Sequence, residues 1–299
     1  MWRRAVVAIL LIGLALGAAV LVMTRPRALP AAQFAGLAGD AARGEAVFHA
    51  AGCASCHIAP EAVEQAEMSA APVLSGGQRF ETAFGTFLAP NISPDPEAGI
   101  GGWTLPQFAS AVMRGVSPEG AHYYPAFPYV AYSHMTREDV ADLYAFFATL
   151  PASEAESRPH ELGFPFNIRA TLGVWKALNL DTGWVLEEAE TEQIARGRYL
   201  VEGLGHCAEC HTPRNALGGL DRARWLAGAP APSGEGRIPA IAPSGLDWAA
   251  EDIAYYLETG FTPEFDSAGG HMALVVQNYA RLPAEDRAAV AGYLKALPF

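Results

Sequence analysis

Near its N-terminus the chain has an apolar run that carries no charge. The run extends from Ala5 to Met23, close to the roughly 20 residues that a helix needs to cross the hydrocarbon core of a bilayer. A cleaved signal peptide has an apolar region of only about 7 to 15 residues that ends at small residues, and residues 15–19 offer such a site. Because the run continues as far as Met23, we expect residues 1–28 to form an uncleaved anchor with a short tip.

Beyond the anchor, apolar residues recur at helical spacing in two widely separated segments. These segments cover residues 136–150 and 283–297, and each begins with Thr or Pro followed by acidic residues, which is a helix-start signal. Two further helices are predicted after the capping residues Asp40 and Thr191. The pattern of apolar positions therefore predicts an all-α fold.

The chain repeats one order of residues on either side of its middle. Both units contain an Arg-Gly pair, a Cys-x-x-Cys-His motif, a Leu-x-Gly segment, two prolines, a tryptophan and a Gly-x-x-Pro segment, and both end in one of the helical segments. Two copies of one domain account for the length of the chain. We therefore predict domains at residues 40–150 and 191–299, a linker at 151–190, and a small-residue tether at 29–39.

Composition and charge exclude some functions. The net charge is -12 and no basic run occurs, which argues against nucleic-acid binding, because clustered Lys and Arg carry that function. The chain has only four cysteines, and all of them lie in the two repeated motifs, at Cys53, Cys56, Cys207 and Cys210. No cysteine is left to form a separate disulfide.

The Cys-x-x-Cys-His motif is the signature of covalent haem c attachment. Two thiols on one turn can form thioether bonds to the vinyl groups of one porphyrin, and the adjacent histidine, His57 or His211, binds the iron. Zinc is the structural alternative, but zinc ribbons place their second pair roughly 15 to 20 residues further on. The long Gly- and Pro-rich loops are expected in a compact domain when they wrap a group such as haem. We predict two covalently bound haem c groups.

The repeat indicates a distal ligand for the second haem. Aligning Trp103 with Trp248 without a gap places Phe127 opposite Met272, which we expect in a loop ahead of the last helix. A methionine paired with a histidine raises the haem potential and suits electron transfer. We therefore predict Met272 as the sixth ligand of the second haem, with its neighbour His271 as an alternative.

The first haem needs a substitute, because Phe127 cannot bind iron. Met135 is the predicted ligand, since it gives the usual His/Met pair, although in the repeat it aligns with the structural residue Leu282. His122 is the alternative and would give a bis-His haem of lower potential. His134 also flanks Phe127, and an iron without any of these ligands would stay five-coordinate.

Other residues are candidates for haem support. Arg79 and Arg214 lie near the expected haem loops, where a guanidinium can pair with a propionate, or they are ordinary surface arginines. Trp103 and Trp248 are expected to pack on haem edges or to donate a hydrogen bond. The aromatic linker stretch 164–178 is expected to pack between the domains, and the alternative is contact with the membrane surface or a partner.

Longer segments resemble the c-type cytochrome subunits that accompany membrane-bound alcohol, gluconate and related dehydrogenases. The resemblance covers nearly the whole chain after the anchor and implies two tandem class I cytochrome c domains with long haem-wrapping loops. Two features depart from the family: its alcohol dehydrogenase members typically carry three haem motifs, and many have Met where Phe127 stands. The matching segments are residues 84–96, 99–104, 124–129 and 205–215.

This resemblance implies a dihaem electron carrier. It would take electrons from a periplasmic or membrane-bound dehydrogenase subunit and pass them to a soluble cytochrome or a terminal oxidase. Since haem c is attached outside the cytoplasm, we expect a single-pass protein of the inner membrane, with a cytoplasmic N-terminal tip and both haems in the periplasm. The alternative is a haem enzyme whose open first haem acts on a small molecule, but the sequence offers no dedicated catalytic group, so a stand-alone enzyme is not expected.

Overall fold

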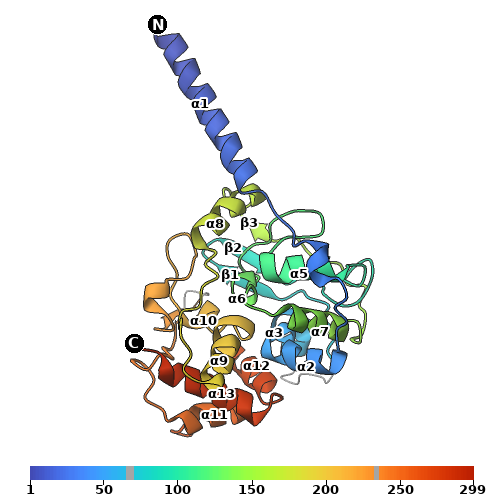
Figure 1. Ribbon diagram of the computed structural model, residues 1–299, viewed down its shortest axis with the longest axis vertical. Helices are drawn as coiled ribbons and strands as arrows, with labels where there is room; N and C mark the ends of the chain where they lie inside the picture. The colour runs from blue at the N-terminus through green and yellow to red at the C-terminus, as the bar shows by residue number, and fades with distance from the viewer. Residues whose placement is uncertain (65–70, 232–235) are drawn as a thin grey trace.

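In a computed structural model that describes residues 1–64, 71–231 and 236–299, one long helix projects from a body of shorter helices (Figure 1). The helices before the linker are α1 (Trp2–Met23), η1 (Ala31–Phe34), α2 (Ala41–Ala50), α3 (Cys53–His57), α4 (Pro60–Glu64), α5 (Leu105–Arg114), α6 (Tyr129–Tyr132) and α7 (Arg137–Phe147). Those that follow are η2 (Arg169–Thr171), α8 (Leu172–Asn179), α9 (Glu192–Arg198), η3 (Tyr199–Leu204), α10 (Ala208–His211), η4 (Arg222–Arg224), α11 (Ala250–Thr259), α12 (Gly270–Tyr279) and α13 (Ala284–Ala296).

The long helix α1 is the predicted anchor. This helix of 22 residues is long and apolar enough to cross a membrane, and none of its residues is buried against the body. The segment 29–39, predicted as a tether, is packed on the body. The Leu29 amide donates to Ser110 Oγ at 3.0 Å, and the Phe34 side chain is buried in the core. The chain is therefore held to the body from the first residues after the anchor.

The two sequence repeats, residues 40–150 and 191–299, form the two halves of the body. Each half is built on a close crossing of two helices. α2 packs on α7, and α9 packs on α13. A glycine lies at each crossing: a Cβ atom on Gly44 would lie 2.0 Å from the Asp142 carbonyl oxygen, and one on Gly197 would lie 1.9 Å from that of Ala289. The repeat in the sequence thus reappears as a repeated helix crossing.

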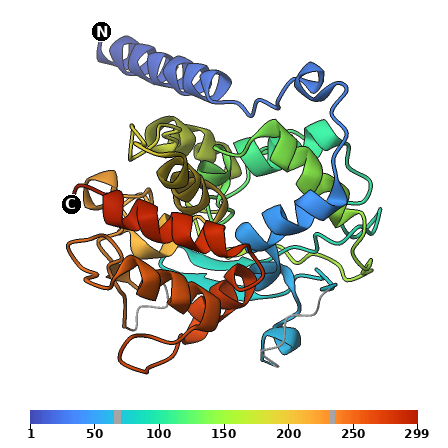
Figure 2. The ribbon, with the colours of Figure 1, turned by 60° about the horizontal axis from the view of Figure 1, so that its bottom comes forward.

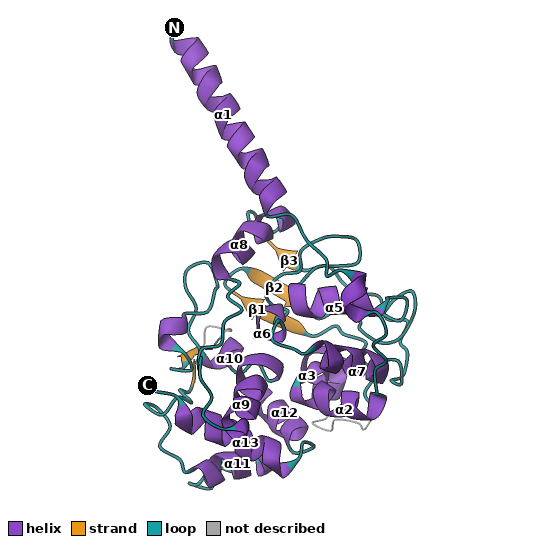
Figure 3. Ribbon diagram, in the orientation of Figure 1, coloured by secondary structure: helices purple, strands orange, loops and turns teal. Residues whose placement is uncertain are grey.

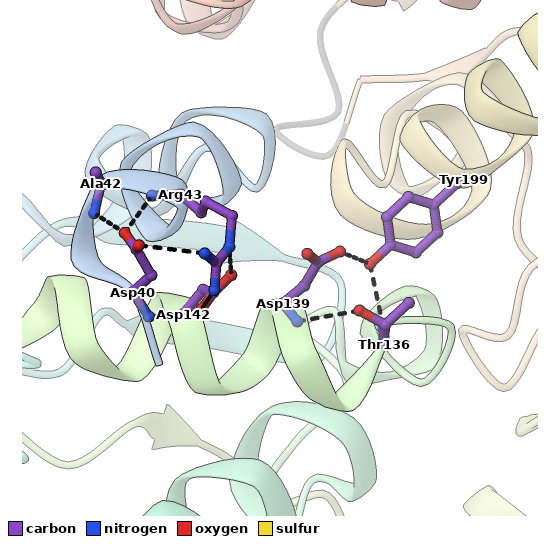
Figure 4. A network of polar contacts seen from close by, with 7 residues as sticks. All are labelled: Asp40, Ala42, Arg43, Thr136, Asp139, Asp142 and Tyr199. Atoms are coloured by element: carbon purple, nitrogen blue, oxygen red, sulfur yellow. Dashed lines mark hydrogen bonds and ion pairs between the residues drawn. The ribbon is translucent and has the colours of Figure 1, made fainter. Parts of the chain in front are cut away.

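A polar network fixes the first crossing (Figure 4). Asp40 caps α2 by accepting from backbone amides, as predicted, and Arg43 donates to both carboxylate oxygens of Asp142 at 2.7 and 2.8 Å. Asp142 is buried, and burial alone would raise the pKa of its carboxyl group. The hydrogen bonds from Arg43 and from the Asp40 amide outweigh burial, so the pKa of Asp142 is lowered.

The same network connects the two halves (Figure 4). Thr136 caps α7 by accepting from the Asp139 amide at 3.0 Å, as its sequence predicted. The hydroxyl group of Tyr199, at the start of η3, donates to Asp139 and accepts from the Thr136 amide. In addition, one continuous core of buried apolar side chains runs from Phe34 to Leu297. The two halves therefore stabilise each other.

The fold is mostly helical, and it departs from the all-α prediction by two small sheets (Figure 3). β1 (Arg79–Thr82), β2 (Gly85–Leu88) and β3 (Glu161–Leu162) form an antiparallel sheet in that order, and β4 (Ala229–Pro230) pairs with β5 (Arg237–Ile238). Strands of two to four residues are too short to show a period-two pattern in the sequence. A second apolar cluster, formed by Phe87, Tyr124 and Leu172, packs on the first sheet.

Replacing Gly197 with alanine should destabilise the protein, because the new Cβ would meet the backbone of α13. Overpacking of this kind costs about 1–3 kcal/mol of unfolding free energy. The matched control is Gly292→Ala in α13, where the nearest atom to a new Cβ is 3.7 Å away on Gln193, so stability should be unchanged or rise by about 0.5–1 kcal/mol. Chemical denaturation of the full chain in detergent, followed by circular dichroism, measures both. Equal effects of the two substitutions would contradict the close crossing.

Replacing Asp142 with asparagine should lower the unfolding free energy at pH 7 by about 1–3 kcal/mol, because it removes charge-assisted hydrogen bonds. The folded pKa of Asp142 is lowered, so this stabilisation is complete above the unfolded value of about 3.9 and is lost as the pH falls through the folded pKa. The variant and the wild type should therefore differ at neutral pH and converge in acid. Glu138→Gln, at an exposed position of the same helix, is the control and should leave the pH profile unchanged.

Candidate haem attachment sites

The first Cys-x-x-Cys-His motif forms the short helix α3. Gly52, with a left-handed φ of 61°, turns the chain into this helix. Cys53 and Cys56 are three residues apart and so lie on the same side of one helical turn. His57 ends the helix, and its Nδ1 lies 2.9 Å from the carbonyl oxygen of Pro90. One turn thus presents two thiols and an imidazole together.

The second motif repeats this geometry. His206, with φ 40°, occupies the left-handed position before Cys207. Cys210 and His211 lie on α10, and His211 Nδ1 is 2.8 Å from the carbonyl oxygen of Pro239. Pro90 and Pro239 belong to the corresponding prolines of the sequence repeat. The same contact therefore positions both histidines.

These contacts determine which imidazole nitrogen can bind a metal. A carbonyl oxygen can only accept, so Nδ1 of His57 and of His211 carries the proton and donates it. The Nε2 lone pair is then available, and no described residue hydrogen-bonds to it in either histidine. Such an outer hydrogen bond is typical of metal-binding histidines. The donor set of each motif, two thiols and one oriented imidazole, fits a covalently attached haem.

None of the four cysteines, all of which lie in the described residues, is paired in a disulfide. Burial raises the pKa of the Cys53 and Cys207 thiols to about 12 and that of the Cys56 thiol to about 11, because a thiolate is disfavoured away from water. Within residues 1–64, 71–231 and 236–299, no group of three or more His, Cys, Asp or Glu side chains is placed to hold a metal ion.

Both motifs lie close to the interface between the halves. The pKa of Cys56 is raised first by burial and then by the nearby Cys210. Asn278 on α12 is buried and donates to Ser55 Oγ at 2.9 Å, inside the first motif. In the opposite direction, the Tyr132 ring of the first half packs edge-on against His206 at 5.5 Å. Each motif is therefore contacted by residues from the other half.

The predicted ligands Met135 and Met272 both lie in the core region that contains the motifs. Met135 is buried in the turn before α7, and its amide donates to the Tyr132 carbonyl oxygen at 3.0 Å. Met272 is partly buried against the same core. It lies in the first turn of α12, so the expectation that it occupies a loop was wrong. His271, its neighbour, is exposed and lies beside Phe80.

The other candidates for the first haem are engaged elsewhere. His122 is buried, and its Nε2 lies 2.9 Å from the carbonyl oxygen of Thr24, at the end of the anchor. His134 stacks on Trp184 with ring centroids 3.9 Å apart. Phe127 packs on Tyr132 at 5.9 Å. His134 directly precedes Met135 in the chain, and Phe127 packs on Tyr132 in the same turn.

The predicted supporting arginines are paired with carboxylates. Arg79 forms a two-point ion pair with Glu161 at 2.7 and 2.8 Å, and Arg214 pairs with Glu209. Sequence reasoning missed Asn278 and the two proline carbonyl groups. The repeated prolines were a usable signal for the carbonyl groups, whereas nothing in the sequence marked Asn278 as a neighbour of the first motif.

Comparisons with known proteins give a consistent result. A sequence model of the family described as cytochrome c matches residues 41–151. The chain is 56% identical over 296 residues to a "Diheme cytochrome c-type" protein of Cereibacter sphaeroides, and the match covers 99% of both. It is 38% identical to the fructose dehydrogenase cytochrome subunit of Gluconobacter japonicus and 33% to the cytochrome c subunit of the alcohol dehydrogenase (quinone) of Gluconobacter oxydans. These two matches cover 86% of this chain but only 52% and 54% of the relatives, so the chain spans about half of their length.

Tyr132 and Tyr279 offer a matched pair of substitutions beside the motifs. The Tyr132 hydroxyl donates to the carbonyl oxygen of Ala51 at 2.8 Å, whereas the buried Tyr279 hydroxyl has no hydrogen-bond partner among the described residues. Tyr132→Phe leaves a buried acceptor unsatisfied and should cost about 1–3 kcal/mol of unfolding free energy. Tyr279→Phe should be neutral or stabilising. Denaturation of the full chain measures both, and an equal loss in the two variants would contradict this assignment.

Proposed function

The chain belongs to the dihaem c-type cytochromes, and we propose that it carries one haem c on each of its two Cys-x-x-Cys-His motifs. The protein is an electron carrier with covalently bound haem c. Haem c supplies an iron that alternates between the ferric and ferrous states. The observation that carries the count of two is the repeated geometry, in which each motif presents two thiols and an imidazole bonded through Nδ1 to a proline carbonyl oxygen.

The proposed domains run from 40 to 150 and from 191 to 299, each a class I cytochrome c unit. In the first domain the thioether bonds form at Cys53 and Cys56, and His57 is the proximal ligand. In the second, Cys207 and Cys210 hold the haem and His211 is the proximal ligand. Support comes from the short helices that place both thiols of each pair on one turn. The linker between them is residues 151–190.

Met135 is the proposed sixth ligand of the first haem. Two observations support Met135. Its side chain is buried, and it lies three residues after Tyr132, whose hydroxyl group donates a hydrogen bond to the carbonyl oxygen of Ala51 just ahead of the first motif. The alternative, His122, is less favoured because its Nε2 is engaged by the Thr24 carbonyl oxygen. A thioether sulfur is uncharged and favours the ferrous iron, so a His/Met pair raises the potential. This suits a carrier more than an open, reactive iron.

Met272 is the proposed sixth ligand of the second haem. Support comes from its alignment with Phe127 in the repeat and from its position at the start of α12. That helix also carries Asn278, which contacts the first motif. Residues of one helix would thus serve both haems. Because the two motifs approach each other, electrons are proposed to pass directly between the two domains.

The proposed electron donor is a dehydrogenase subunit. Support comes from relatives named as the cytochrome subunits of fructose, alcohol and gluconate dehydrogenases. A soluble cytochrome or a terminal oxidase is the proposed acceptor. The anchor α1 is proposed to lie in the inner membrane with its N-terminus in the cytoplasm and both haem domains in the periplasm, where haem c is attached. None of the relatives compared is named as a stand-alone haem enzyme, so the enzyme alternative is not favoured.

Electron paramagnetic resonance of the oxidised full chain should show two low-spin ferric signals in equal amounts. Met135→Ala should convert one signal to high spin or to a different low-spin form, and Met272→Ala should convert the other. Met113→Ala, at a partly buried methionine of α5 that packs on the core, is the control and should preserve both. An unchanged first signal in Met135→Ala would exclude this ligand, and a high-spin signal in the wild type would indicate an open iron.

A further inference from the structure

The anchor is joined to the body by direct contacts at its last turn. The carbonyl oxygen of Thr24, the residue that ends α1, lies 2.9 Å from His122 Nε2. The same oxygen lies so close to Gly173 on α8 that a Cβ atom there would be only 2.2 Å away. Two segments distant in sequence thus hold the point at which the chain leaves the membrane. The following residues stay on the body, because Leu29 is bonded to Ser110.

A loop with exposed apolar side chains lies beside this joint. It connects β3 to η2, and Phe164, Phe166 and Ile168 on it are 81, 44 and 42% exposed. Singly exposed apolar residues are ordinary, but three on one short loop form a patch that needs a partner. In Figure 1 the neighbouring elements β3 and α8 occupy the end of the body from which α1 leaves, and Figure 2 shows the long helix α1, in blue, in a view turned by 60°.

Hydrogen bonds tie this loop to the residues that hold the anchor. Tyr124 donates from its hydroxyl group to the Phe166 carbonyl oxygen at 3.0 Å, and Arg169 donates to the His122 carbonyl oxygen at 2.8 Å. His122 in turn holds Thr24. The loop and the end of the anchor are therefore linked through His122. If the end of the anchor lies at the bilayer surface, the loop lies close to that surface too.

The loop also packs on apolar side chains of the body. The Phe166 ring packs edge-on against Phe84 with centroids 5.1 Å apart. Phe84 lies in the turn between β1 and β2 and packs on the small cluster of Phe87, Tyr124 and Leu172. Apolar side chains thus continue from the interior of the body to its exposed surface beside the anchor.

We propose that Phe164, Phe166 and Ile168 form a membrane-apposed surface that rests in the headgroup region of the bilayer. The occupant is lipid because this surface is linked through His122 to the end of a helix that is long and apolar enough to span the membrane. Aromatic side chains are favoured at this depth, and the exposed Arg25 and Arg27 that follow the anchor suit lipid phosphates. The net charge of -12 would keep the rest of the body off an anionic membrane, so the apolar loop fixes how the body lies.

The test uses single cysteines in the haem-loaded full chain, placed in nanodiscs of phosphatidylcholine and phosphatidylglycerol. The variants are Phe164→Cys, Phe166→Cys and the control Phe265→Cys, which replaces a 94% exposed side chain between α11 and α12. The native cysteines do not react when they form thioethers, and only this step depends on the proposed function. Mass spectrometry measures the rates of labelling by a charged maleimide and by an apolar one.

We expect the charged reagent to label positions 164 and 166 at least tenfold more slowly than position 265, with a smaller difference for the apolar reagent. Equal rates at the three positions would overturn the proposal, as would protection that appears only after a dehydrogenase complex is added, which would identify a protein partner. Two loop positions are tested so that the misfolding of one variant does not decide the result. Haem content and spectra are measured on the same samples, so failure of haem attachment is distinguished from failure of membrane contact.

Discussion

A hydrogen bond from an imidazole to a proline carbonyl oxygen is the contact on which each proposed haem site depends. It joins a short motif helix to a loop 33 residues away in the first half and 28 residues away in the second. The bond fixes the orientation and the tautomer of the histidine, which leaves the Nε2 lone pair available for the proposed iron. The long Gly- and Pro-rich segments are thus organised around the histidines.

The two halves then bring their sites together through a small number of buried polar contacts. Asn278 reaches from α12 to Ser55 in the first motif and also bonds to His49 at 3.1 Å. Tyr199 joins η3 to the start of α7. Buried polar groups of this kind require specific partners, because an unpaired group costs more than a pair contributes. They therefore select one arrangement of the halves, whereas the shared apolar core supplies most of the stability.

The sequence predicted those features that depend on residues close together along the chain. The haem motifs, the anchor and the helix caps at Asp40 and Thr136 were predicted because each depends on residues within a few positions. The short strands were missed because they contain too few residues for a pattern. The helical position of Met272 was missed because a gap-free alignment does not report backbone shape. The contact of Asn278 with Ser55 joins residues 223 positions apart, and no local signal predicts it.

The packed joint at Thr24 limits how this carrier can meet other proteins. A haem domain on a loose tether can swing, so one molecule can visit a donor and an acceptor in turn. With α1 in the membrane as proposed, this joint would remove the swinging motion and leave two freedoms: lateral diffusion in the bilayer and rotation about the membrane normal. Each proposed haem would then be carried at a constant height above the lipid. A partner must offer its own redox centre at that height, which makes vertical alignment a criterion for choosing partners.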